Sequence, residues 1–79
     1  MSSVLKKGSR GEDVKALQVD LNRFGYGLDT DGVFGDGTEG AVRHLQKSFG
    51  YTVDGMVGDG TRALIAQQHG YNWHKDNPT

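Results

Sequence analysis

The sequence of 79 residues has no cysteine, and its single proline, Pro78, stands next to the C-terminus. Without thiols the chain can form no disulfide and no thiolate metal site, so packing and hydrogen bonds alone must stabilise a small core. The chain also lacks the roughly 20 consecutive apolar residues of a membrane-spanning helix. No apolar run like that of a signal peptide follows Lys6 and Lys7. We therefore expect one small domain that makes no contact with a membrane.

A strong charge of either sign is also missing, since 9 basic and 10 acidic residues leave a net charge of −1. Proteins that bind nucleic acid concentrate basic residues on one face. Electrostatic attachment to a membrane needs a basic cluster as well. The charge balance therefore argues against nucleic acid as a partner and against an electrostatic membrane anchor.

Glycine is in excess, with 13 residues where average usage of about 7% would supply roughly five or six. Much of the excess falls in a repeated segment. Asp31 to Thr38 matches Asp54 to Thr61 at a distance of 23 residues, with six of eight positions identical. Because Asp-Gly pairs are typical of tight turns, the repeat predicts two loops of one type between helices.

Three helices are predicted from apolar residues at helical spacing, over Glu12 to Phe24, Gly37 to Phe49 and Gly60 to His69. Each predicted helix is followed by glycine and then tyrosine. The glycine can adopt the left-handed conformation that ends a helix, and the tyrosine can fold back on the last turn. The expected fold is all-α: a small three-helix bundle of pseudo-repeated helix–loop–helix units. Residues 1–71 would form the domain, and 72–79 a polar tail or the start of a linker.

The loops contain a short apolar pair in each copy, Val33-Phe34 and Met56-Val57, which we expect to insert into the core. Asp36 precedes the second predicted helix and Asp59 the third, so both are expected to cap a helix N-terminus. Gln18 and Gln46 occupy equivalent positions beside core leucines. A half-buried glutamine usually bonds to nearby backbone, so both are predicted to hold a loop in place. Gly40, inside the second predicted helix, has no assigned role beyond a close helix approach or chance.

The motifs of the chain resemble those of the bacterial peptidoglycan-binding domain family. The first part fits the pattern G-x-x-G-x-x-V-x-x-L-Q-x-x-L from Gly8 to Leu21, followed by Gly25-Tyr26. The second fits D-G-x-F-G-x-x-T-x-x-A-V-x-x-[FL]-Q from Asp31 to Gln46. The third fits D-G-x-V-G-x-x-T-x-x-x-L from Asp54, with Ile65 at the final leucine. Each motif is weak alone, but three in order at compatible spacing are specific.

The resemblance implies a three-helix, non-catalytic module that binds cell-wall peptidoglycan through its glycan strand or its stem peptide. The partner in the same protein or complex would be a catalytic wall hydrolase, as in endolysins, amidases and muramidases. We expect a monomer without a cofactor that acts at the cell wall or in the periplasm. Because no signal peptide is visible, it would be phage-encoded, secreted by another route, or processed. The alternative is a protein-interaction or inhibitory pro-domain of the same fold, although the zinc-ligating cysteine of such pro-domains is missing.

Six residues are the candidate contacts with peptidoglycan. Tyrosines can stack on sugar rings with their apolar face, and an arginine can pair with the carboxylates of a stem peptide. Aspartates of the repeated turns either bind the ligand or accept backbone hydrogen bonds, the second role being favoured. The candidates are Tyr26, Asp31, Phe34, Arg43, Tyr51 and Asp54.

Metal and catalytic sites are not predicted. Asp29 to Gly32 is similar to part of a calcium-binding EF-hand loop, but Gly27 stands where that loop needs its first oxygen ligand, and Thr38 stands where it needs a glutamate. The histidines His44, His69 and His74 fit no zinc-ligand spacing. No pair of a nucleophile and a base is visible in the sequence, which predicts binding without catalysis.

Overall fold

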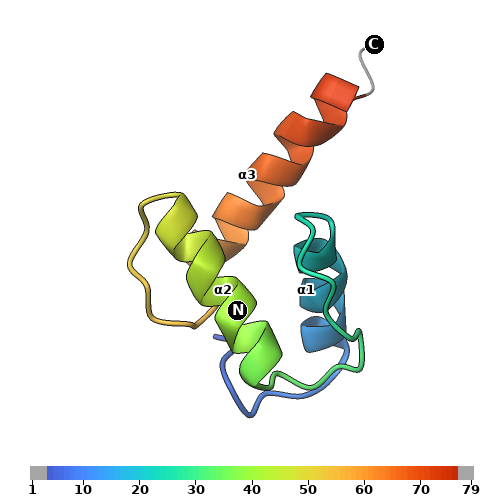
Figure 1. Cartoon of the computed structure of the whole chain (residues 1–79), viewed down its shortest axis with the longest axis vertical. Helices are drawn as coiled ribbons and strands as arrows, with labels where there is room; N and C mark the ends of the chain where they lie inside the picture. The colour runs from blue at the N-terminus through green and yellow to red at the C-terminus, as the bar shows by residue number, and fades with distance from the viewer. Residues whose placement is uncertain (1–3, 77–79) are drawn as a thin grey trace.

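The computed structural model describes the backbone of residues 4–76 and the side chains of residues 4–67. Within that part the chain forms three helices, α1 (Glu12–Asn22), α2 (Asp36–Ser48) and α3 (Asp59–Asp76). Helices α1 and α2 lie beside the first turns of α3, which then extends away from both of them (Figure 1). The prediction of an all-α, three-helix fold is confirmed.

The core is built from one apolar face of each helix and two inserted loop residues. Phe34 and Val57 are each 1% exposed, so the predicted insertion of the loops into the core is confirmed for these two. Their neighbours Val33 and Met56 are each 38% exposed and do not take part. The other buried apolar residues are Leu5, Val14, Leu17, Leu21, Ala41, Val42, Leu45, Leu64 and Ile65.

The N-terminal segment joins the two loops through backbone hydrogen bonds. Leu5 exchanges two bonds with Val57, with N···O distances of 3.0 and 2.7 Å. Farther along, the backbone N–H of Phe34 donates to the carbonyl of Ser9 at 2.9 Å, and the N–H of Gly11 donates to the carbonyl of Gly32 at 2.9 Å. Each loop is therefore held on one side by the start of the chain.

The predicted aspartate caps are wrong. Helix α2 begins at Asp36 itself, its N-cap is Gly35, and no side chain bonds to the free backbone N–H groups there. The carboxylate of Asp36 instead forms an ion pair with Lys7 of the N-terminal segment. Helix α3 likewise begins at Asp59, which makes that residue the first of the helix rather than its cap.

Helix α2 ends as the sequence predicts, with a glycine in the left-handed conformation. Gly50 has φ of 73°, its N–H donates to the carbonyl of Lys47, and the N–H of Tyr51 donates to the carbonyl of Gln46. This pair of bonds is the Schellman motif. Phe49 lies at the turn with 40% of its surface exposed, so it does not belong to the core.

The other two helix ends differ from the prediction. Helix α1 stops at Asn22, two residues early, and a short turn leads to Gly25 with φ of 96°. Helix α3 continues through Gly70 to Asp76, so the predicted end at His69 is wrong. A glycine inside a helix costs only about 1 kcal/mol, and no proline follows before Pro78 to force an end. The packing expected of Tyr71 lies outside the described side chains, and the domain boundary at residue 71 stays a prediction.

Candidate functional site

The first repeated loop is organised around the buried side chain of Gln18, which is 1% exposed. Its Nε2 atom lies 3.1 Å from Oδ1 of Asp31, 2.9 Å from the carbonyl oxygen of Val33 and 3.1 Å from the hydroxyl of Thr38. Its Oε1 atom accepts the backbone N–H of Gly32 at 2.8 Å. The amide of one α1 residue therefore ties the loop to the start of α2.

The second loop repeats this arrangement around Gln46, also 1% exposed. Its Nε2 atom donates to Oδ1 of Asp54 at 2.9 Å, to the carbonyl of Met56 at 2.9 Å and to the hydroxyl of Thr61 at 3.1 Å. The N–H of Gly55 donates to its Oε1 at 3.0 Å. The predicted loop-holding role of both glutamines is thus present in the structure, and it is the same in the two copies.

The aspartates of the repeat are part of these networks. Oδ1 of Asp31 accepts the N–H of Val33 at 3.0 Å, and Oδ1 of Asp54 accepts the N–H of Met56 at 2.9 Å. These backbone bonds, followed by those from Gln18 and Gln46, lower the pKa of each carboxyl below its usual range. The donors of the turn and of the two glutamines therefore favour the charged form of each carboxyl.

Two loop positions require glycine. Gly32 has φ of 76°, and an added Cβ would stand 3.0 Å from the carbonyl oxygen of Gly11. Gly55 has φ of 73°, and its Cβ would stand 3.1 Å from Cγ of Glu39 and 3.3 Å from Cγ of Arg43. The Asp-Gly pairs therefore serve the turn geometry, as the favoured interpretation of the sequence predicts.

Tyr26 lies over the flank of α2. Its hydroxyl is 2.8 Å from Nδ1 of His44, and the two rings meet edge to face with centroids 5.6 Å apart. Burial raises the pKa of the tyrosine. Beside the ring is an open hollow of about 280 Å³, to which Gly37 and Gly40 contribute. Apart from its chain neighbours and the nearby backbone of α2, nothing lies within 4 Å of a Cβ added to Gly40, so this glycine leaves space in the hollow and does not serve a close helix approach.

The six candidate residues divide into three groups. Tyr26 and Asp31 belong to the first loop, and Tyr51 and Asp54 to the second, where Arg43 contributes to the lowered pKa of Asp54. Phe34 is 1% exposed, so its side chain has no surface for a ligand. The structure thus does not gather the candidates into one cleft.

Sequence reasoning missed three exposed apolar side chains near Tyr51, which is itself 41% exposed. These neighbours are 38–40% exposed: Phe49, Val53 and Met56. The counterparts of Phe49, Tyr51 and Val53 in the first copy, Phe24, Tyr26 and Leu28, pack partly against the core. Val33, the counterpart of Met56, is 38% exposed like Met56 itself. The repeat made the two loops look equivalent, and the sequence holds no signal that one is covered and the other open.

The described residues contain neither a cluster of metal ligands nor a helix that could span a membrane. Among them, no group of three or more histidines, aspartates or glutamates is arranged to hold a metal ion. Within the same part of the chain, no helix has the length and apolar character needed to cross a membrane.

The fold and the paired loops define a class of small repeat-built helical domain, and comparison with known proteins gives its family. The model of the family described as "Putative peptidoglycan binding domain" matches residues 10–65, and the chain belongs to that family. The family relationship expected from the sequence motifs is confirmed.

Three relatives illustrate the similarity. The spore cortex-lytic enzyme of Oceanobacillus iheyensis is 41% identical over 70 residues, which are 87% of this chain and 25% of that protein. The crystal structure of the SleB N-terminal domain has a TM-score of 0.82 at 40% identity, over 86% of this chain and 94% of that one. A fused zinc-dependent amidase/peptidase and peptidoglycan-binding protein of Clostridium acetobutylicum has a TM-score of 0.79 at 43% identity, over 82% of this chain and 29% of that one. The chain therefore spans about a quarter of the curated relative.

Proposed function

We propose that this peptidoglycan-binding domain catalyses nothing itself and holds an attached or associated wall-active enzyme on the cell wall. A weak site on an insoluble polymer raises the effective concentration of a tethered enzyme at its substrate. The relatives support this role, because spore cortex-lytic enzymes and a fused amidase each contain a region similar to this chain. The site of action would be the wall or the periplasm.

The observation that carries the proposal is that some residues of the repeated loops maintain the structure while others are exposed. The aspartates, the glycines and the inserted Phe34 and Val57 are occupied by hydrogen bonds or by the core. Tyr51 and Met56 keep about two fifths of their surface exposed, at 41% and 38%. A loop fixed from beneath presents such side chains with little further loss of conformational freedom on binding.

We assign the contact surface to the edges of the two loops. Tyr26 and Tyr51 would meet sugar rings with their apolar faces, and Arg43 would pair with a stem-peptide carboxylate. Asp31 and Asp54 would act through the loop backbone that they position. Phe34 would support the first loop from the core.

Sedimentation with purified sacculi tests the proposal. The wild-type chain should pellet with sacculi at low salt, and Tyr51→Ala should pellet less. The matched control is Val19→Ala, which removes a valine that is 40% exposed on α1 and should pellet like the wild type. Wild-type protein that stays wholly in the supernatant would contradict binding. Clearing of a sacculus suspension by the chain alone would contradict the absence of catalysis.

A further inference from the structure

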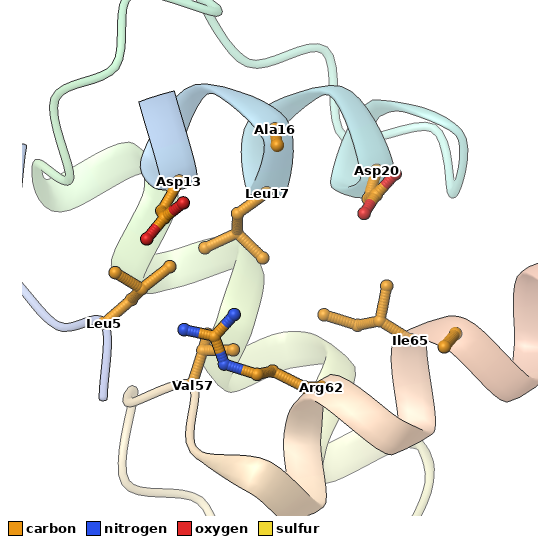
Figure 2. A pocket seen from close by; sticks show the side chains of 9 residues that line it. Leu5, Asp13, Ala16, Leu17, Asp20, Val57, Arg62 and Ile65 are labelled. Carbon is orange, nitrogen blue, oxygen red and sulfur yellow. The ribbon is translucent and has the colours of Figure 1, made fainter. Parts of the chain in front are cut away.

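A pocket of about 210 Å³ lies between α1 and α3, and none of the exposed side chains of the two loops lines it. Its floor is apolar and consists of Leu5, Leu17, Val57 and Ile65 (Figure 2). Small-molecule pockets usually measure roughly 300–1,000 Å³. The size therefore suits a single amino-acid side chain better than a disaccharide.

Charged side chains stand around this apolar floor. Asp13 and Asp20 both project from α1 toward the pocket, and Arg62 enters from α3 (Figure 2). The two aspartates are seven residues apart, which is about 10.5 Å along a helix. The Arg62 guanidinium lies toward Leu5 and Val57, at the Asp13 end, while Asp20 lies above Ile65. One end of the pocket thus combines both signs of charge, and the other carries a carboxylate.

We propose that this pocket binds a peptide residue whose aliphatic side chain ends in a primary amine. The apolar floor would cover the methylene groups, since long charged side chains bury their stems while the charged end stays in a polar setting. The ammonium group would lie at Asp20, and a carboxylate of the same peptide would face Arg62. Ala16 and Ala66, also in the lining, are small enough to leave room for the peptide backbone.

The occupant that this chemistry selects within peptidoglycan is the diamino acid of the stem peptide, so the inference rests on the proposed function. It separates two kinds of contact on one domain. The loop edges would meet the glycan and, through Arg43, a carboxylate of the stem peptide, whereas the α1–α3 pocket would meet the diamino acid. Two weak contacts with one polymer strengthen binding without either being tight.

An NMR titration of the full chain tests the inference with three probes. The first is an N-terminally acetylated stem peptide that contains a diamino acid, the second is the same peptide with its side-chain amine acetylated, and the third is the wall disaccharide. The first should shift the amides of Ala16, Leu17 and Ile65, and the second should bind about tenfold more weakly because a charge-assisted bond is lost. Equal binding of the two peptides, or pocket shifts caused by the disaccharide alone, would overturn the inference.

Two substitutions sharpen the test. Ala16→Leu fills the mouth of the pocket and should abolish the peptide-induced shifts, whereas Ala63→Leu makes the same change at an exposed α3 position that does not line the pocket. Asp20→Asn should weaken peptide binding about tenfold, and Glu12→Gln, a charge removal elsewhere on α1, should not. If Ala63→Leu weakens binding as much as Ala16→Leu, the pocket is not the site.

The sacculus experiment distinguishes a failure of this inference from a failure of the proposed function. Sacculus binding without peptide shifts at the pocket would remove this inference and leave the proposed function intact. No binding to sacculi or to any of the three probes would remove both.

Discussion

The side-chain amide of Gln18 lies 3.1 Å from the hydroxyl oxygen of Thr38, and both residues are buried. This bond connects α1 with the first turn of α2 across the whole first loop. Gln46 and Thr61 make the same bond, also at 3.1 Å, between α2 and α3. Two hydrogen-bonded glutamines therefore join the three helices in sequence order, in a chain that has no disulfide to do so.

Gln18→Leu should lower the free energy of unfolding by roughly 2–4 kcal/mol, because the buried N–H of Gly32 loses its acceptor and the buried hydroxyl of Thr38 loses a donor. Gln46→Leu should have a similar effect through the second loop. The same change at Gln67, which is exposed on α3, should cost less than about 0.5 kcal/mol. Urea denaturation measures all three, and a loss at Gln67 equal to that at Gln18 would contradict the role of the networks.

One substitution made at two glycines should have opposite effects. Gly32→Ala should destabilise the chain by about 1–3 kcal/mol, because φ is 76° and the new Cβ would press on the carbonyl of Gly11. Gly40→Ala should stabilise it by up to about 1 kcal/mol, because the residue is inside α2 with open space around it. Thermal denaturation followed by circular dichroism gives the sign of each change. Two losses of similar size would show that the hollow beside Tyr26 does not tolerate a methyl group.

Acid should weaken the fold through Asp31 and Asp54. Each carboxyl has a lowered pKa in the folded chain, against about 3.9 in the unfolded one. The stability that they contribute is complete above the unfolded value and is lost as the pH falls through the lower folded value. Unfolding free energies measured between pH 7 and pH 2 should therefore fall at the acidic end.

In the double variant Asp31→Asn/Asp54→Asn, the unfolding free energy should fall less steeply with decreasing pH than in the wild type. It should not become independent of pH, because the ion pair with Lys7 also lowers the pKa of Asp36. An unchanged slope would mean that the two turn carboxyls titrate alike in the folded and unfolded chains.

The features that the sequence predicted well are those carried by side-chain type. Apolar spacing located the three helices, and the repeat located Phe34 and Val57 in the core. The pairing of Leu5 with Val57 was not predictable in this way, because backbone bonds leave no mark on residue identity. Asp36 is a common capping residue that here pairs with Lys7, a partner distant in sequence. The candidate binding surface was harder to predict than the fold, because Tyr26 and Tyr51 are equivalent in the repeat and differ only in how far other side chains cover them.

That difference in cover leads to a last prediction about the two tyrosines. Tyr26 packs against the core and bonds to His44, so Tyr26→Ala should lower the unfolding free energy by about 1–3 kcal/mol. Tyr51 is 41% exposed, and Tyr51→Ala should change stability by less than about 0.5 kcal/mol. Both should reduce sedimentation with sacculi, but only Tyr51→Ala should do so without a loss of stability. Chemical denaturation and sedimentation of the same preparations separate the two effects. If Tyr51→Ala is stable and sediments like the wild type, the second loop edge is not part of the binding surface.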